Sequence, residues 1–575
     1  MFRSSSRLFR ATPTAHRHPL LARSVASVTA KSAFVTKPTD RDPYQYQASS
    51  DPTLSELYSN ANVQVGFGNR FASEAIPGTL PNGQIMPQKN KYDLYTEGIT
   101  GSAFVAPRKD NLNVWIYRIR PSVAHQGFTP LPDNPDLESN FFPLNPKVQF
   151  SPTQLAWHPF ALPSSGSKVD FLTGLKSLAG SGDPTLNEGL AIHIYTANSS
   201  MENRAVVNAD GDMLIVPQLG RLDIQTEFGK MMVRPGEICV IQKGIRFKVG
   251  LPDGDSRGYI QEIFGSHFEL PELGPLGGHG LANVRDFEHP IASFDIDQSP
   301  WEIVYKLGGK LWSCKQNHTP FDVVAYHGNY IPYKYALEKF VNVGSISKDH
   351  IDPSIFCVLT AKSKTPSAPL TDFLVFSPRW DVASDSYRPP YYHRNASSEF
   401  MGLIYAYGAK RTSFRSIFCV LTARSKTPGA PLTDFLVFSP RWDVASNTYR
   451  PPYYHRNSSS EFMGLIYGNY AGRSDDFAPG GASYECGHVA HGVSYEVFKE
   501  ATEAELQPMR ISEGTVAFMM ESSLMFTLTD YAMKRSGKLH VHNPSMWDDL
   551  DAQFLKHLDS VDQNLKGHGL PGLKK

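Results

Sequence analysis

The chain of 575 residues carries 56 basic and 56 acidic side chains, and 41% of its residues are hydrophobic. This composition is typical of a folded globular protein and excludes disordered, collagen-like and coiled-coil chains. A net charge of zero argues against nucleic acid or an anionic membrane surface as a main partner. No apolar run reaches the ~18 residues of a membrane-spanning helix, so we expect no membrane partner.

The first 45 residues resemble an organelle transit peptide. Residues 1–39 carry five Arg and two Lys, and no acidic residue precedes Asp40. Such a stretch can form the basic amphipathic helix of a targeting segment. A basic tail without a targeting role, or an upstream start codon that is not used, is the alternative. We therefore predict a disordered, transit-like leader over residues 1–45 and leave it out of the fold.

The five cysteines indicate a reducing compartment. They form no Cys-x-x-Cys pair and no even disulfide framework, which favours an intracellular protein over a secreted one. They are Cys239, Cys314, Cys357, Cys419 and Cys486.

Residues 55–338 are expected to form an N-terminal β-sandwich domain. The clearest evidence runs from Gly211 to Val249, where alternating apolar residues are interrupted by Gly and Pro-Gly turns. Period-two segments with turns about every eight to twelve residues indicate an antiparallel sandwich or jelly roll. The turn pattern also resembles the second half of a cupin barrel. The fold class predicted for the chain is therefore mainly β.

Residues 339–535 are predicted to form a smaller C-terminal domain, followed by a tail over 536–575. In the tail, Ser545 is expected to cap a helix whose third residue is Asp548. Apolar residues then recur at helical spacing, which predicts an amphipathic helix that docks or packs rather than one that carries chemistry. These residues are Trp547, Leu550, Phe554, Leu558 and Leu565.

The C-terminal domain contains a tandem repeat. Residues 354–405 and 416–467 match at an offset of 62, with five differences over 52 positions. Two copies are too few for a solenoid, which needs about three stacked units. Only one copy can occupy a given place in a packed domain. We therefore expect the other copy to be looped out, disordered or paired in another way.

Each copy of the repeat carries a His and a Glu six positions apart, His393 with Glu399 and His455 with Glu461. Six residues along a straight strand span ~20 Å, too far for one metal ion. On a helix the two side chains would lie on different faces. A polar turn between them would fold the chain back so that they converge. A third ligand would come from elsewhere, and His491 follows Glu461 by 30 residues.

Two imidazoles and one carboxylate on one face of a metal leave positions open for substrate and O₂. That donor set is the facial triad of non-haem Fe(II) oxygenases. On spacing alone, ordinary surface or core polar residues remain the alternative, and His488 lies close enough to compete with His491.

Longer motifs resemble the homogentisate 1,2-dioxygenase family. The run PPYYHRNSSSEFMGLIYGNY, followed by APGGASYECGHVAHGVSYE, carries the likeness, as do VGFGNRFASEAIPGTLPNGQ, HFELPELGPLGGHGLANVRDF and DHIDPSIF upstream. The resemblance extends from about residue 60 to 535. It implies cupin-type β-barrels, a C-terminal domain that holds Fe(II), and homo-oligomers in which trimers pair into hexamers. It also implies a cytoplasmic enzyme of tyrosine and phenylalanine catabolism that converts homogentisate and O₂ to maleylacetoacetate.

Carried over by residue, the resemblance makes His455, Glu461 and His491 the metal ligands. It makes His350 the catalytic base and Tyr470 a hydrogen-bonding contact of the substrate, against which His491 would also lie. The base would take the phenolic proton of the substrate, because an imidazole titrates near neutral pH.

The duplication makes His393 and Glu399 alternative ligands. Copy two is continuous with Tyr470 and His491 at the family's separations, whereas His350 keeps the family's separation only from His393. We favour copy two, because three ligands on a locally intact segment need less rearrangement of the chain. Before His491, where the family usually has a proline, this chain has Val489 and Ala490.

Two rival functions remain open from the sequence. One is a cupin-type binding protein that the duplication has inactivated. The other is a different metal-cupin enzyme, an isomerase or a hydrolase, that uses the same ligands without O₂.

Overall fold

The computed structural model describes the greater part of the chain from residue 66 onward. The chain divides into two compact units, residues 1–40 and 41–575, and all described residues belong to the second. The predicted leader over residues 1–45 lies outside the described residues. The described residues are 66–81, 89–103, 105–270, 282–340, 357–362, 369–374, 419–424, 431–443, 453–470, 477–540 and 547–573.

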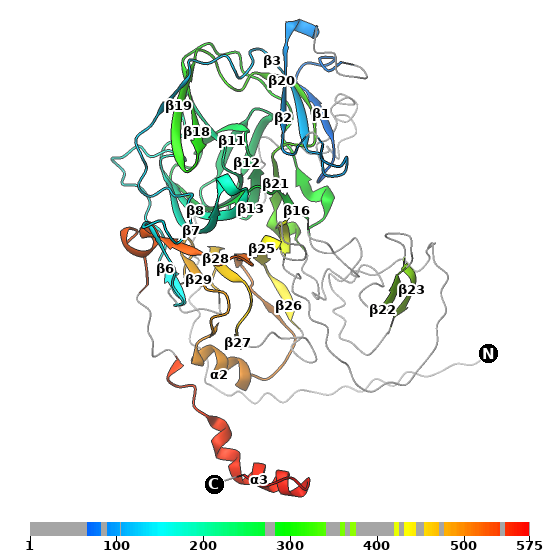
Figure 1. The fold of residues 1–575 in the computed structure, drawn as a ribbon, viewed down its shortest axis with the longest axis vertical. Coiled ribbons are helices and arrows are strands. Elements are labelled where there is room, and N and C mark those ends of the chain that lie inside the picture. Colours follow the sequence, from blue (N-terminus) through cyan, green and yellow to red (C-terminus); the bar gives the residue numbers. More distant parts are fainter. Residues whose placement is uncertain are drawn as a thin grey trace, which may run out of the picture. The chain divides into compact units, whose positions relative to one another are not determined.

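A nine-stranded antiparallel sheet is the central layer of the described fold (Figure 1). Its strands, in spatial order, are β17 (Phe287–Glu288), β21 (Tyr333–Ala336), β13 (Glu237–Ile241), β10 (Asp212–Leu219), β15 (Ser256–Phe264), β8 (Glu188–Ala197), β7 (Leu175–Asp183), β33 (Thr527–Thr529) and β5 (Val148–Gln149).

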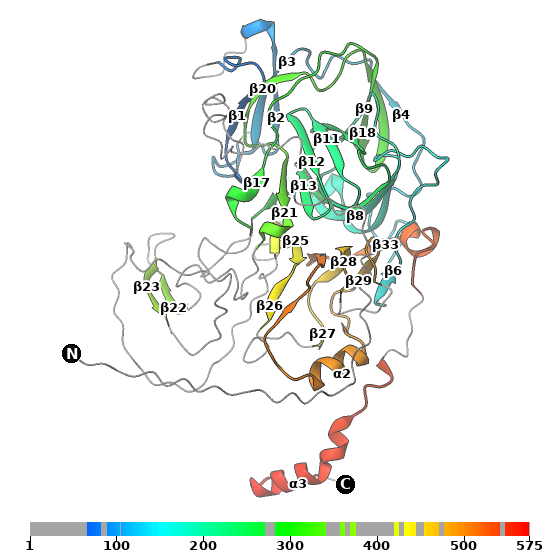
Figure 2. The same cartoon turned by 180° about the vertical axis from the view of Figure 1, so that it is seen from behind.

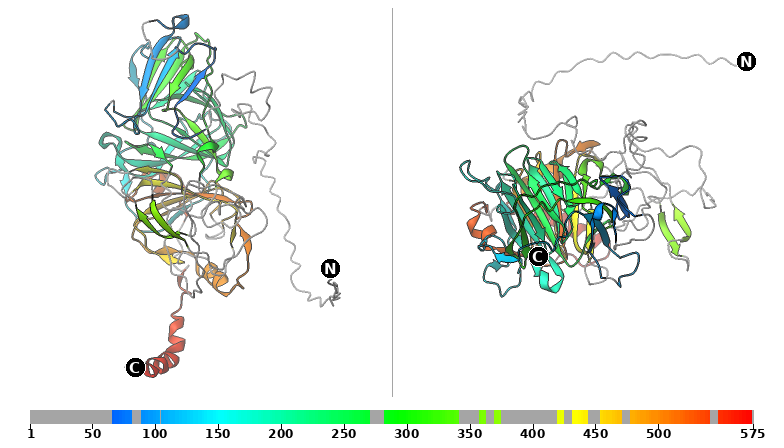
Figure 3. Two further views of the ribbon diagram at one scale, coloured as in Figure 1. Left: turned by 90° about the vertical axis from the view of Figure 1, so that its right-hand side faces the viewer. Right: turned by 90° about the horizontal axis from the view of Figure 1, so that it is seen from above.

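Two further sheets belong to the N-terminal half, and Figures 2 and 3 show their strands running side by side. The larger contains β12 (Gly229–Val233), β11 (Leu222–Thr226), β14 (Arg246–Gly250), β9 (Arg204–Asn208), β18 (Trp301–Leu307), β19 (Lys310–Gln316) and β4 (Phe128–Pro130). The smaller contains β1 (Phe71–Glu74), β20 (Val323–Gly328), β3 (Asn113–Arg118) and β2 (Tyr95–Thr100). Among the described strand pairs, β9 with β18 is the one parallel pair.

The remaining sheets of the described chain are a second seven-stranded sheet, formed mostly by C-terminal strands, and three two-stranded ones. The large sheet contains β16 (Phe268–Glu269), β24 (Cys419–Arg424), β25 (Pro431–Phe438), β32 (Val516–Ser522), β28 (Ser460–Tyr467), β29 (Ala482–Glu485) and β6 (Leu155–Trp157). The small sheets pair β22 (Cys357–Lys362) with β23 (Pro369–Leu374), β26 (Arg441–Asp443) with β31 (Met509–Ile511), and β27 (Tyr454–His455) with β30 (His491–Gly492).

The nine-stranded sheet is buried on both faces. Along β10, Leu214 and Val216 belong to the hydrophobic cluster shared with the C-terminal sheet. Met213 and Ile215 point the other way, into the cluster shared with β11, β12 and β14. Successive side chains of a strand alternate between faces, so a strand with apolar residues at every position must be covered twice. The prediction of stacked, mainly antiparallel sheets is confirmed, and β10 to β14 divide the segment from Gly211 to Val249 at its predicted turns.

Three strands cross the predicted boundary between the domains. β33 inserts into the nine-stranded sheet beside β7, while β6 and β16 form the two edges of the C-terminal sheet. The two layers also meet through side chains: Tyr259 stacks edge-on against Phe518 at 4.9 Å, and Gln261 donates to the Thr433 hydroxyl at 2.7 Å. The division at residue 338 stays a prediction, and the C-terminal sheet is built partly from N-terminal chain.

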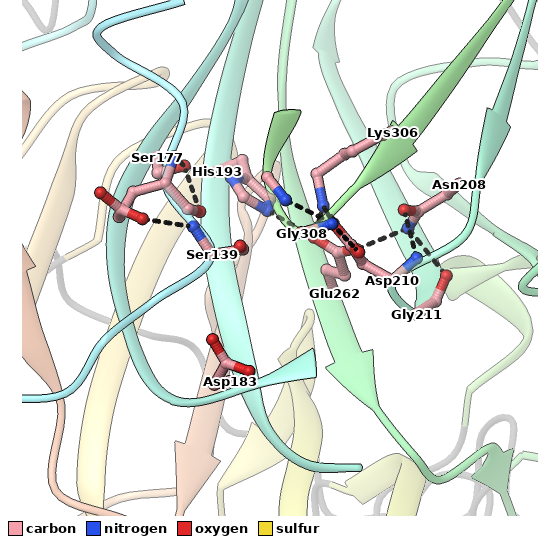
Figure 4. A network of polar contacts seen from close by, with 12 residues as sticks. Ser139, Ser177, Asp183, His193, Asn208, Asp210, Gly211, Glu262, Lys306 and Gly308 are labelled. Carbon is pink, nitrogen blue, oxygen red and sulfur yellow. Dashed lines mark hydrogen bonds and ion pairs between the residues drawn. The ribbon is translucent and has the colours of Figure 1, made fainter. Parts of the chain in front are cut away.

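A buried network of charges joins β18, β8 and β15 (Figure 4). The Lys306 ammonium donates to Asp210 at 2.7 Å and to both oxygens of Glu262 at 2.9 Å. His193 Nε2 lies 3.0 Å from the same Glu262 carboxylate. Burial alone raises the pKa of Glu262, but the Lys306 charge and the His193 hydrogen bond hold it well below its usual range. The Lys306 charge and the His193 hydrogen bond therefore keep the buried Glu262 carboxylate ionised.

Substitution of Lys306 should destabilise the protein strongly. Lys306→Met leaves Asp210 and Glu262 buried without their cation, so the free energy of unfolding should fall by about 3–5 kcal/mol in urea denaturation. Lys310→Met, at an exposed position of the same hairpin, should change it by about 0.5 kcal/mol or less. Equal losses for the two variants would show that the network has no special weight.

The two copies of the repeat form hairpins with the same register. In copy one Cys357 pairs with Leu374 and Thr360 with Asp372, and the equivalent pairs recur 62 positions later in β24 and β25. Both hairpins also carry the same two irregularities. Their surroundings differ: β24–β25 lies between β16 and β32, whereas β22–β23 forms a sheet of two. Copy two thus occupies the C-terminal sheet, and copy one is paired separately, as one of the predicted alternatives requires.

The assignment of copy two to this sheet predicts a specific disulfide. Glu269 and Thr422 are direct cross-strand partners, and such partners have Cα atoms ~4.5–5.5 Å apart, within disulfide range. Glu269→Cys with Thr422→Cys should therefore cross-link on mild oxidation, as read by mass spectrometry without reduction. Glu269→Cys with Thr360→Cys places the same pair in copy one and should not. A cross-link between positions 269 and 360 would show that copy one occupies the sheet.

The C-terminal helix begins later than predicted. Instead of a helix capped by Ser545, which lies outside the described residues, Trp547 lies in a turn, and α3 covers Leu558–Gly567 after a 3-10 turn at Gln553–His557. The three Asp residues between positions 548 and 551 are poor helix formers, and the Trp547 indole donates to the Val493 carbonyl at 3.2 Å. Within the described chain, α3 has no buried residue.

Other helices are short. α2 (Tyr495–Glu503) is capped by the Ser494 hydroxyl, which accepts from the Val497 amide at 3.4 Å. Single helical turns occur at η1 (Lys91–Asp93), η2 (Pro184–Leu186), η4 (Val284–Asp286), η5 (Leu337–Lys339) and η7 (Tyr531–Arg535). In the described part of the chain, no helix has the length and apolar character needed to cross a membrane. The thiols of Cys239, Cys314, Cys419 and Cys486 are buried and free.

Candidate metal centre

Strand β28 supplies the acidic residue of the candidate site. It runs between β32 and β29 in the C-terminal sheet, and Glu461 is its second residue. Glu461 lies opposite Glu521 on one side and Glu485 on the other. Apolar residues further along the strand, Phe462 and Ile466 among them, anchor β28 in the core between the nine-stranded sheet and the C-terminal sheet. The carboxylate is therefore held on a rigid central strand.

The two-stranded sheet of β27 and β30 supplies the histidines. His455 and His491 are direct cross-strand partners, with ring centroids 4.4 Å apart and ring planes at 69°. α2 follows β30, and the Phe498 ring on this helix lies 5.4 Å from Tyr453 and 5.7 Å from Tyr454. Because cross-strand partners point to the same face, the pairing brings both imidazoles to one side.

The polar turn after His455 lets these residues converge, as predicted. One ligand atom from each of His455, Glu461 and His491 lies within 4.8 Å of the other two. His491 Nε2 is 3.9 Å from Glu461 Oε1. Glu461 and His491 are each 7% exposed, and His455 is half-buried. Among the described residues, this is the one group of three such side chains close enough to share a metal ion.

The hydrogen bonding of His491 suits a metal ligand. Its Nδ1 lies 2.9 Å from the Val489 carbonyl, which can only accept, so Nδ1 carries the proton. This leaves Nε2 facing Glu461, and this buried atom has no hydrogen-bond partner among the described residues. A ligating histidine whose other nitrogen donates to a backbone carbonyl is the usual arrangement in metal sites. The residues present therefore fit a divalent metal ion.

Acidic side chains extend across the sheet beside Glu461. The registers place Asp434, Glu521, Glu461 and Glu485 in one row over β25, β32, β28 and β29. Burial raises the pKa of Asp434, and the Glu521 charge adds to the rise. The Gln154 amide donates to Glu485 at 3.2 Å. Like charges on directly opposed positions repel, so a cation beside Glu461 would relieve its repulsion with Glu521 and Glu485.

The other predicted site residues lie elsewhere or cannot be placed. Tyr470 follows the opposite end of β28 from Glu461 and packs against Phe438 and Phe477 at 6.1 and 6.2 Å between ring centroids. About six residues of strand, ~20 Å, separate the two ends, so its contact with a substrate stays a prediction. His488 is exposed in a left-handed turn with φ 62° and does not join the cluster. The predicted residues outside the described chain are His350, His393 and Glu399.

The sequence did not reveal two neighbours of the centre. Glu485 was missed because its position opposite Glu461 depends on a strand pairing between segments 24 residues apart. Asn457, whose side-chain amide donates to Glu461 Oε1, lies inside the polar turn that was predicted. The sequence signal that could have identified Asn457 was its position between the two predicted ligands His455 and Glu461.

Two imidazoles and a buried carboxylate on a central strand define a candidate mononuclear metal centre of the facial-triad type. Two models of known protein families match the chain. The model "Homogentisate 1,2-dioxygenase N-terminal" matches residues 62–337. The model "Homogentisate 1,2-dioxygenase C-terminal" matches twice, over residues 338–416 and 413–554. The double match follows from the tandem repeat, because each copy satisfies part of the same model.

Curated relatives agree with the family models. Homogentisate 1,2-dioxygenases from Mus musculus and Homo sapiens are each 44% identical over 494 residues, covering 85% of this chain and 96% of their own length. The enzyme of that name from Emericella nidulans is 41% identical, covering 90% of this chain and 98% of its own length. The chain belongs to the homogentisate 1,2-dioxygenase family. The resemblance seen in the sequence is confirmed.

Neutralising Glu485 should affect stability and cation binding in opposite directions. Glu485→Gln removes one of the two charges opposed to Glu461, so the metal-free protein should gain about 0.5 kcal/mol in the free energy of unfolding. The same change removes a negative charge beside the candidate centre. Binding of Co²⁺, used as a probe ion and measured by anaerobic titration, should therefore weaken several-fold. Weaker binding together with lower stability would instead indicate a disturbed fold.

Proposed function

We propose that this chain is a ring-cleaving dioxygenase that converts homogentisate and O₂ to maleylacetoacetate. The observation that carries the proposal is the convergence of His455, Glu461 and His491 within 4.8 Å in a chain of this family. The reaction balances without another reductant, because both atoms of O₂ end in the ring-opened product. Its place is in tyrosine and phenylalanine catabolism.

Fe(II) is the metal that we assign to the site. His455, Glu461 and His491 would hold it, and it would supply the electron transfer that couples the aromatic ring to O₂. The donor set supports this choice, because two imidazoles with one carboxylate suit Fe(II) and leave positions open. The protein's own contribution is to orient the ligands and to exclude water around the buried Glu461 and His491.

Acid–base chemistry is assigned to His350. An imidazole there would take the phenolic proton of homogentisate, since its ordinary pKa lies near neutrality. Tyr470 would donate a hydrogen bond to the substrate, and His491 would lie against it. These three roles are inferred from the sequence motifs that the chain shares with the family.

We also propose that the enzyme works as a homo-oligomer, a trimer or a hexamer, in the cytoplasm. The basic leader makes the mitochondrion the alternative location. Both statements rest on resemblance and on the composition of residues 1–39.

Paired substitutions in the two copies test the function and the site together. The purified chain, loaded anaerobically with Fe(II), should consume one O₂ per homogentisate in an oxygen electrode. His455→Ala removes a ligand and should lower the rate by at least about 100-fold. His393→Ala makes the same change in the same local sequence of copy one and should leave the rate unchanged.

Other results would favour the rival functions. If O₂ uptake is lost in His393→Ala and kept in His455→Ala, the metal site lies in copy one. Turnover of substrate without O₂, or with Zn²⁺ in place of Fe(II), would indicate an isomerase or a hydrolase. A wild-type chain that binds neither Fe(II) nor homogentisate would be an inactivated member of the family.

A further inference from the structure

Asn457 contacts both parts of the chain that carry the candidate ligands. It lies in the polar turn between His455 and Glu461, and its side-chain amide donates to Glu461 Oε1. Its backbone carbonyl accepts from the His488 amide at 2.7 Å. His488 belongs to the turn that leads into His491. One residue therefore links the His455–Glu461 segment to the segment of the third ligand.

The two turns are packed backbone against backbone. The Gly487 amide donates to the Ser460 hydroxyl at 3.4 Å. A Cβ added at Gly487 would lie 3.2 Å from the carbonyl carbon of Ser459, so a larger residue would push the turns apart. His488 adopts φ 62°, a left-handed conformation that non-glycine residues rarely take. The hydrogen bond from its amide to Asn457 accompanies this unusual geometry.

An amide suits this position for an electrostatic reason. A carboxylate that binds a metal must keep its charge and present one orientation. A lysine or arginine beside Glu461 would orient it too, but its positive charge would compete with the metal ion. The neutral Asn457 amide restricts rotation of the carboxylate and leaves its charge available. Hydrogen bonds of this kind to ligating groups commonly set metal affinity.

We propose that Asn457 is a positioning residue for the metal centre: its side chain orients the Glu461 carboxylate, and its backbone fixes the turn that presents His491. The inference rests on the proposed function, because it requires a metal at His455, Glu461 and His491. It adds to the ligand set a residue that sets how tightly and in what geometry the ion is held.

The test separates the side chain from the backbone. Asn457→Ala removes the amide and keeps the carbonyl that accepts from His488, so the metal-free chain should unfold within about 5 °C of wild type. Its Co²⁺ affinity, measured by anaerobic titration of full-length protein, should fall about 10–100-fold. The visible absorption of bound Co²⁺ should also change, because the carboxylate is free to rotate. A purely structural role would leave that spectrum unaltered.

Asn395→Ala is the matched control, since Asn395 is the equivalent residue of copy one. It should keep wild-type affinity and spectrum. Should Asn457→Ala fold poorly, Asn457→Leu, which is similar in size and has neither an amide donor nor a charge, should give the same change of spectrum. Wild-type affinity and spectrum in a folded Asn457 variant would overturn this inference alone. A wild-type chain that binds no Co²⁺ would overturn it together with the proposed function.

Discussion

The register of β28 between β32 and β29 is the constraint on which the candidate centre depends. It places Glu461 on the face reached by His455 and His491, and in line with Glu521 and Glu485. A slip of one residue would turn Glu461 to the opposite face and bring an apolar neighbour, Phe462, to the candidate site. The buried side chains of β28 oppose such a slip, because Phe462 and Ile466 belong to the cluster between the two large sheets. The packing of the core therefore fixes the position of the Glu461 side chain.

The tandem repeat shows which features of a hairpin depend on its own sequence and which depend on the chain around it. The two hairpins share a register down to their irregularities, as expected if nearly identical sequences specify their own turns and pairs. What distinguishes them is the chain around them. β16 and β32 flank copy two, and copy two continues directly into the segment that carries His491. Which copy supplies the candidate ligands is thus a property of connectivity, which no comparison of the two copies alone could decide.

Much of the architecture follows from sequence pattern, and the limits are physical. The turns between Gly211 and Val249 set five strands, β10 to β14, because Gly and Pro-Gly interrupt an alternating apolar pattern. The convergence of His455 with Glu461 followed from the polar turn between them. Glu485 and the hydrogen bond of Asn457 depend on pairings between distant segments. The helix expected at Ser545 began near Leu558, because helical spacing of apolar residues did not outweigh three aspartates.

The central claim is that copy two, with His491, holds the metal. Anomalous X-ray scattering at the absorption edge of cobalt, from crystals of the Co²⁺-loaded full chain, tests it most directly. The account predicts one strong peak per chain, within ~2.0–2.2 Å of an imidazole nitrogen of His455 and His491 and of a Glu461 oxygen. A peak beside His393 and Glu399 instead, or no peak at either copy, would contradict it.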